Sequence, residues 1–110
     1  MSKRDLSLLI EDMLASVDKI MNYTAGLSFD AFLKDEKTVD AVIRNFEIIG
    51  EAANRIDPVF RDQHPEIQWR RIRGFRNRIV HDYFGIDYGI VWSIIEDDLD
   101  DLSKQLKLLI

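Results

Sequence analysis

The chain of 110 residues contains no cysteine, only two prolines, and no hydrophobic run longer than a few residues. The lack of cysteine excludes disulfides, thiolate metal ligands and cysteine nucleophiles, and it fits a reducing compartment. The lack of a long apolar run excludes a transmembrane helix, and no apolar block of a secretory signal follows residues 1–5. We therefore expect a cytoplasmic protein with no membrane partner.

Positive charge is also scarce overall, since 15 lysines and arginines oppose 20 acidic residues and leave a net charge of −5. This balance argues against simple binding of nucleic acid, which usually needs an excess of positive charge. The window 61–81, however, holds six arginines against Asp62 and Glu66, which gives +4 there and −9 in the rest. The arginines are Arg61, Arg70, Arg71, Arg73, Arg76 and Arg78. Such a basic island can hold a polyanion locally, although Arg70 and Arg71 can equally pair with acids on neighbouring helices.

The sequence carries no pattern typical of a metal or cofactor site. The five glycines are scattered and form no phosphate-binding loop, and neither His-Glu-x-x-His nor a calcium-loop pattern occurs. His64 precedes Pro65 without a partner at ligand spacing, so we interpret it as structural. No metal and no cofactor are expected.

Apolar residues recur every three to four positions, which is the period of an amphipathic helix. The predicted elements are a long helix over 5–23, a short helix over 28–33 capped by Ser28, a long helix over 38–56, a segment over 57–69 that is mostly connection with room for one short turn of helix, a helix over 70–84, and a last helix capped by Asp87. No strand pattern competes. The sequence thus predicts one all-α domain over 1–110, an up-and-down bundle of four main helices plus a short one.

The helix predicted over 38–56 carries two features of interest, a glycine in its interior and a charged face. Gly50 lies inside it, where glycine costs about 1 kcal/mol relative to alanine, and close contact with another helix would account for it. Arg44 and Glu51 are seven residues apart and therefore share one face of this helix. The face can be charged surface with intrahelical pairs, or it can be directed at a functional helix. Trp69 and Trp92 are interpreted as packing anchors, with a dimer interface as a further possibility.

The stretch 76–83 collects a fixed cation, an imidazole and a phenol within eight residues. The guanidinium of Arg76 can fork two donors onto a phosphate, and His81 can move a proton near neutral pH. Together they suit a phosphodiester. The alternative for His81 is a structural histidine near a helix C-terminus, bonded to the last carbonyls.

Helical geometry constrains this site if the helix continues to residue 84. At about 100° per residue, Tyr83 projects about 20° from Arg76, whereas His81 projects about 140° away from it. A compact site would then need a long reach by Arg76, a distortion near Gly85, or a second copy of the helix across a two-fold axis. The last solution predicts a homodimer. Asn77, four residues before His81, would orient it from the same helical face.

The pattern Arg-x4-His-x-Tyr, with Asn77 directly after the arginine, resembles the signature of HepT-like proteins, the HEPN-domain toxins of the MNT–HEPN toxin–antitoxin systems. Residues 41–53 resemble the central helix of that family, and residues 64–69 resemble the turn before its motif helix. The resemblance covers essentially the whole chain and implies an HEPN-like helical bundle.

The resemblance implies a toxin that is a metal-independent endoribonuclease, in which the RNA 2′-hydroxyl is the nucleophile. His81 would take or deliver a proton, Arg76 would stabilise the phosphorane oxygens, and Arg73 and Arg78 would bind RNA. It also implies an MNT-type nucleotidyltransferase as the antitoxin, which adds AMP to Tyr83 and fills and neutralises the site. A half-buried structural ring is the alternative for Tyr83.

A second class of function stays open. The chain could be a noncatalytic dimeric module that binds nucleotides or a nucleotidyltransferase partner, with Arg76 holding a phosphate without turnover. The acidic body favours this module, whereas the intact pair of Arg76 and His81 favours the enzyme. Cleavage by the purified protein separates the two.

Overall fold

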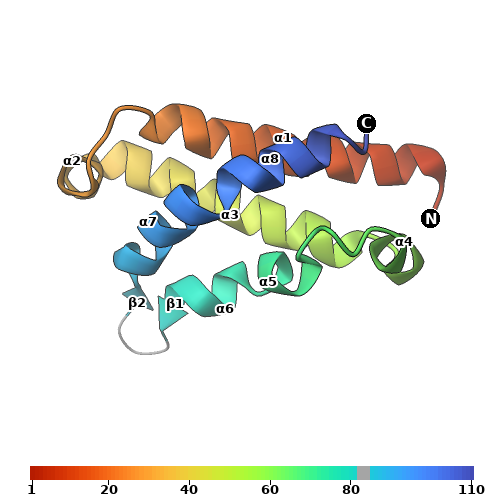
Figure 1. Cartoon of the computed structure of the whole chain (residues 1–110). Coiled ribbons are helices and arrows are strands. Elements are labelled where there is room, and N and C mark those ends of the chain that lie inside the picture. The colour runs from red at the N-terminus through yellow and green to blue at the C-terminus, as the bar shows by residue number, and fades with distance from the viewer. Residues whose placement is uncertain (82–84) are drawn as a thin grey trace.

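Two long helices pack side by side in the computed structural model, which describes residues 1–81 and 85–110 and, at His81, the backbone alone (Figure 1). The elements in chain order are α1 (Lys3–Thr24), α2 (Phe29–Lys34), α3 (Glu36–Arg55), α4 (Pro58–Gln63), α5 (Trp69–Arg73), α6 (Phe75–Ile79), β1 (Val80–His81), β2 (Gly85–Ile86), α7 (Tyr88–Asp97) and α8 (Leu99–Lys107). The all-α, HEPN-like bundle predicted from the sequence is confirmed. Over the described residues, no helix combines the length and the apolarity needed to cross a membrane.

Polar side chains cap several of the helices, and two of these caps, Ser28 and Asp87, were predicted from the sequence. The Ser28 hydroxyl before α2 and the Asp87 carboxylate before α7 each accept, at 3.1 Å, the amide N–H three residues later. Ser2 and Asp35 cap α1 and α3 in the same way. A hydrogen bond from the Thr38 hydroxyl, together with one from its amide, holds the pKa of the Asp35 carboxyl below its usual 3.8.

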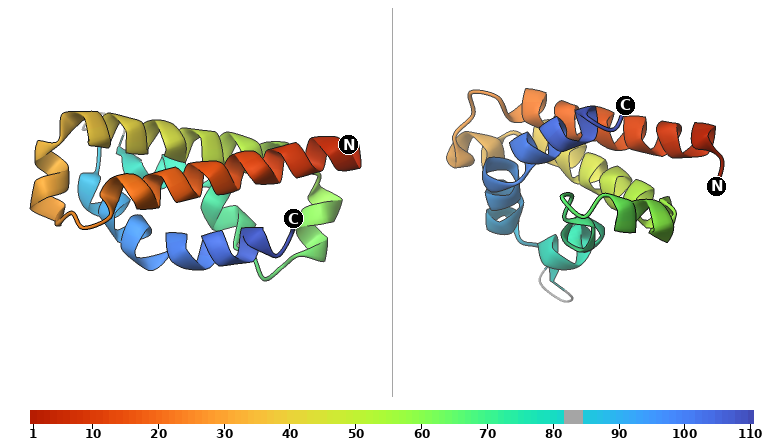
Figure 2. Two further views of the ribbon diagram at one scale, coloured as in Figure 1. Left: turned by 90° about the horizontal axis from the view of Figure 1, so that it is seen from above. Right: turned by 45° about the vertical axis from the view of Figure 1, so that its right-hand side comes forward.

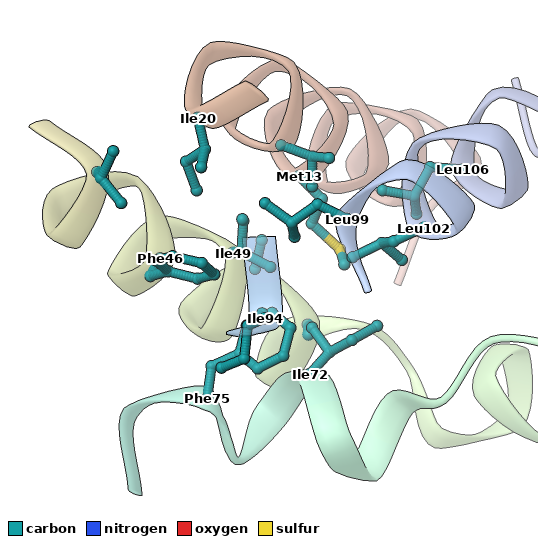
Figure 3. Packing of buried hydrophobic residues seen from close by; sticks show 14 of the residues in the cluster. Met13, Ile20, Phe46, Ile49, Ile72, Phe75, Ile94, Leu99, Leu102 and Leu106 are labelled. Carbon is teal, nitrogen blue, oxygen red and sulfur yellow. The ribbon is translucent and has the colours of Figure 1, made fainter. Parts of the chain in front are cut away.

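The core lies where the helices converge. Helix α1 packs against α3 and α8, while α5 and α6 pack against α3 from the other side (Figures 1 and 2). The rings of Phe46 and Phe75 meet edge to face at a centroid distance of 5.4 Å. Figure 3 shows buried side chains from six helices in one cluster: Met13, Ile20, Phe46, Ile49, Ile72, Phe75, Ile94, Leu99, Leu102 and Leu106. The core therefore fixes α5 and α6 against α3, which is the contact that forms the site described below.

Both predicted late helices are interrupted. The last one is divided at Asp98 into α7 and α8, and the helix predicted over 70–84 is divided at Gly74 into α5 and α6. The Gly74 backbone has φ −89° and ψ 3°. Its amide donates to the Arg70 carbonyl at 3.1 Å, and a Cβ at Gly74 would lie only 3.2 Å from that carbonyl oxygen. A glycine accommodates this tight turn without a clash.

The helix predicted to reach residue 84 ends instead at Ile79, and a short antiparallel pair of strands follows. Val80 pairs with Ile86 and His81 pairs with Gly85, whose φ of +76° favours glycine. The sequence prediction of a continuous helix through this segment, with no strand, was wrong. A tertiary hydrogen bond 2.7 Å long joins the Asp87 amide to the carbonyl of Ile79, where α6 ends.

This correction removes the geometric argument made from the helix. His81 is in β1 and not on the helix of Arg76, so the angle of about 140° between their side chains does not apply. The homodimer predicted from that angle is therefore not supported by the geometry of α6. The placement of Asn77 and His81 on one helical face was also wrong, because only Asn77 is in α6.

Candidate active site

An open groove separates α3 from the end of α5 and the start of α6. Its volume is about 480 Å³. Arg73, Arg76 and Asn77 line one wall, and all three side chains are exposed. The opposite wall is a stripe of α3 at helical spacing, formed by Phe46, Glu47, Gly50, Glu51 and Asn54. The buried rings of Phe46 and Phe75 hold the two walls together at its base.

The guanidinium of Arg76 faces this groove without an ion-pair partner among the described residues. Among the described residues, no carboxylate forms an ion pair with it and no hydrogen bond engages its guanidinium. Both donors of the fork stay available for a ligand. The neighbouring Arg73 is held differently, because its Nε donates to Asn54 Oδ1 at 2.7 Å. That partner is neutral, so Arg73 keeps its full charge while its orientation is fixed.

Acidic residues on α3 complete the electrostatics of the groove. Arg44 pairs with Glu47 at 3.7 Å within α3, so the intrahelical pair considered for this face is present. Glu51 lines the groove opposite Arg76 and Asn77, which confirms that part of this face approaches the helix of the motif. The groove thus holds two arginines and two glutamates. Because the glutamates repel negative charge, the groove favours a ligand that places a phosphate directly at Arg76 over a ligand whose negative charge lies elsewhere in the groove.

Gly50 forms part of the groove wall at the contact of α3 with α5. A Cβ at this position would meet the Ile72 carbonyl oxygen at 3.9 Å, an ordinary van der Waals distance. The predicted approach of another helix is therefore present, but it leaves room for a methyl group.

The other arginines of the basic island lie away from this groove. Arg71 forms a bidentate pair with Asp98, with its Nε and Nη2 at 2.8 and 3.1 Å from the two carboxylate oxygens. Arg78, predicted to bind RNA, approaches the same carboxylate at 3.5 Å. Pairing with acids was an open alternative for Arg70 and Arg71: Arg71 forms such a pair, whereas Arg70 has no such partner among the described residues.

The structure brings together only part of the predicted site. Arg73, Arg76 and Asn77 line one groove, while Arg78 does not. The side chain of His81, the predicted proton carrier, and the whole of Tyr83, the predicted AMP acceptor, lie outside the described residues. Their roles stay predictions.

Sequence reasoning missed Asn54 as a residue of the site. Its side chain anchors Arg73, and it lies three residues after Glu51 and seven after Glu47 on one helical face. That spacing was the available signal. The spacing does not indicate a site by itself, because the sequence does not show that α5 and α6 pack against this face of α3.

His64 and the tryptophans have structural environments. The His64 imidazole lies 3.2 Å from Glu66 Oε1, and its ring lies 4.4 Å from that of Phe60. The buried Trp69 donates from its indole to the His64 carbonyl at 2.9 Å, and Trp92 stacks near Phe32 at 5.1 Å. These contacts agree with the structural interpretation, and a dimer interface at the tryptophans stays a prediction. In the described ranges, no three histidine, aspartate or glutamate side chains are grouped as metal ligands.

Comparison with known proteins agrees with this geometry. The family model of HepT-like ribonucleases matches residues 13–109. A protein of Methanocaldococcus jannaschii named "Putative RNase MJ1380" is 36% identical over 109 residues, which cover 99% of this chain and 100% of the relative. A Thermococcus cleftensis protein named "Probable ribonuclease HepT" is 37% identical over 107 residues, 97% of each chain. No solved structure matches the chain. Because the match spans both walls of the groove, from α3 through the Arg76 segment, the chain belongs to the HepT-like ribonuclease family.

Proposed function

We propose that this protein is the toxin of a type VII-like toxin–antitoxin system and acts as a metal-independent endoribonuclease. The observation that carries the proposal is the exposed Arg76, without an ion-pair partner among the described residues, on an open groove of a chain in a ribonuclease family. A guanidinium in such a position is suited to a phosphate.

The chemistry proposed is an intramolecular transesterification, in which phosphorus is transferred from the 5′-oxygen to the 2′-oxygen of the RNA strand. The 2′-oxygen attacks the adjacent phosphorus, the bond from phosphorus to the 5′-oxygen breaks, and the products are a 2′,3′-cyclic phosphate and a 5′-hydroxyl. One proton leaves the 2′-hydroxyl and one arrives at the 5′-oxygen, and His81 carries one of these transfers. Arg76 bonds the nonbridging oxygens as negative charge develops on them.

The other groove residues have supporting roles in this proposal. Arg73, oriented by Asn54, adds a second cation beside the scissile phosphate. Asn77 is next to Arg76 on α6 and lines the same wall, so its amide can bond the substrate. This differs from the role first predicted for Asn77, which required His81 on the same helix.

Regulation and assembly belong to the same proposal. Tyr83 accepts AMP from an MNT-type nucleotidyltransferase antitoxin, and the added anion blocks Arg76 and His81 for RNA. The active form proposed is a homodimer, in which the open groove of one chain lies near that of its partner; the helical angle that first predicted a dimer does not support it. A monomer that cleaves RNA at full rate would remove this part of the proposal alone.

A noncatalytic module that binds nucleotides or the nucleotidyltransferase is the second candidate. The observation in its favour is the pair of glutamates in the groove, Glu47 and Glu51, which oppose the approach of a polyanion. Binding of a nucleotide by the wild-type protein without cleavage of any RNA would select this candidate.

The deciding experiment is cleavage of labelled RNA by purified, unmodified protein, with analysis of the product ends. Arg76→Lys and His81→Ala should each lose most of the activity, because an ammonium cannot reproduce the guanidinium fork and alanine cannot transfer a proton. Arg44→Lys is a matched control, since Arg44 is an exposed arginine that does not line the groove. Cleavage retained by a folded His81→Ala variant, or products without a cyclic phosphate, would contradict the mechanism.

A further inference from the structure

A second groove lies on the outer side of α5, toward α4. Its volume is about 890 Å³, and five arginines line it: Arg61, Arg70, Arg71, Arg73 and Arg78. Asp62 is the acidic residue among its lining. Asp98, which pairs with Arg71 and Arg78 from outside the groove, is the second acid to count. Five positive charges less these two leave about +3 on the groove of a chain whose net charge is −5.

The two grooves share one residue. Arg73 lines both, with its Nε fixed by Asn54 at 2.7 Å on the side of the candidate active site. A strand whose phosphate binds at Arg76 can therefore continue past Arg73 into the second groove.

The availability of the arginines in the second groove differs. Arg71 is committed to Asp98 through two hydrogen bonds, and Arg61 donates to the Ala53 carbonyl at 3.3 Å near the end of α3. Arg70 is exposed and has neither an ion pair nor a hydrogen bond from its side chain to another described residue. The fork of Arg70 is consequently the one most open to a phosphate.

We propose that the second groove binds the part of a single-stranded RNA that flanks the scissile phosphate, with Arg70 as its principal phosphate contact. This inference extends the proposed function by adding a binding surface beyond the site of cleavage. Phosphate contacts of this kind are independent of base sequence and weaken with salt. The groove would thus favour long, unpaired RNA over short fragments, while the acidic remainder of the surface repels RNA elsewhere.

The test measures binding of fluorescent RNA to full-length protein in the His81→Ala background, so that the RNA stays intact. Two strands share one core, a short strand of about 5 nucleotides and a longer strand of about 15 nucleotides, which spans the range of common single-strand sites. Arg70→Glu should weaken binding of the longer strand about tenfold and of the short strand less than about twofold. Arg70→Gln should reduce the slope of log K against log salt by about 0.7, the value for one lost phosphate contact on a single strand.

Lys19→Glu is the matched control, because this substitution changes the net charge by the same amount as Arg70→Glu. Lys19 is exposed on α1 and lines neither groove. Circular dichroism confirms that each variant is folded. If Arg70→Glu and Lys19→Glu weaken the longer strand equally, only net charge matters and the proposal is overturned. It is also overturned if Arg70→Glu leaves RNA binding unchanged and abolishes binding of a nucleotidyltransferase, since the groove would then serve a protein partner.

The binding readout separates this inference from the proposed catalysis. A wild-type protein that never cleaves RNA, but whose affinity for the longer strand depends on Arg70, would support the second groove and refute the enzyme. The second groove alone would be refuted if the wild-type protein cleaves RNA and Arg70→Glu changes the affinity for neither strand.

Discussion

The amide N–H of Asp87 donates a 2.7 Å hydrogen bond to the carbonyl oxygen of Ile79, the last residue of α6. In a continuing helix, that carbonyl would accept the amide four residues later. Here it accepts from Asp87, and Val80 and His81 then pair with Ile86 and Gly85. The segment between Arg76 and His81 therefore changes from helix to strand.

The first prediction concerns the other role of Asp87, as the cap of α7. Asp87→Ala removes the carboxylate that accepts the Ile90 amide at 3.1 Å, and it should lower the free energy of unfolding by at least about 1 kcal/mol. Urea titration followed by circular dichroism measures the loss. Asp87→Asn keeps a capping oxygen and should retain that share of the stability. An equal loss in both variants would show that the charge, and not the cap, stabilises the protein.

Gly50→Ala should stabilise the protein, by up to about 1 kcal/mol, because alanine is the better helix former. The added methyl has its nearest neighbour, the Ile72 carbonyl oxygen, at 3.9 Å and needs no rearrangement. Thermal unfolding should show a higher Tm, by about 4 °C. Gly26→Ala is the opposite case, since its φ of +76° opposes any residue with a Cβ, and it should lower the Tm. A destabilised Gly50→Ala protein would mean that α3 and α5 pack more tightly than the structure indicates.

Tyr83→Phe should remain toxic to cells yet escape neutralisation, because the phenol oxygen is the proposed acceptor of AMP and takes no part in the proposed cleavage. Coexpression with the cognate nucleotidyltransferase, followed by mass spectrometry, should detect AMP on Tyr83 of the wild-type protein and none on the variant. Neutralisation of Tyr83→Phe to the wild-type level would remove Tyr83 from the regulation.

RNA cleavage should continue in excess chelator, since the proposed mechanism uses Arg76 to stabilise charge where a metal ion otherwise would. The rate is compared with and without chelator at constant ionic strength, because phosphate binding depends on salt. Activity that disappears in chelator and returns only with magnesium or manganese would refute metal independence.

The helices of the fold are decided largely by local sequence. Apolar spacing of three to four residues located α1 and α3, and Ser28 and Asp87 marked the starts of α2 and α7. These features depend on contacts within one turn of the chain, so periodicity and capping chemistry are enough to predict them. The recognised motif likewise indicated the family, which the comparisons confirm.

Local sequence determined the candidate active site only in part. Sequence identified Arg76 and Asn77, but the groove exists because α3 carries Asn54 and Glu51 to the opposite wall. The same local sequence that favours a helix beyond Ile79 is overruled by the bond from Asp87. Likewise, which arginine of the basic island is neutralised depends on Asp98, 27 residues beyond Arg71. Each of these outcomes is a contact between residues distant in the chain, and the free energy of such a contact arises only once packing has brought the partners together.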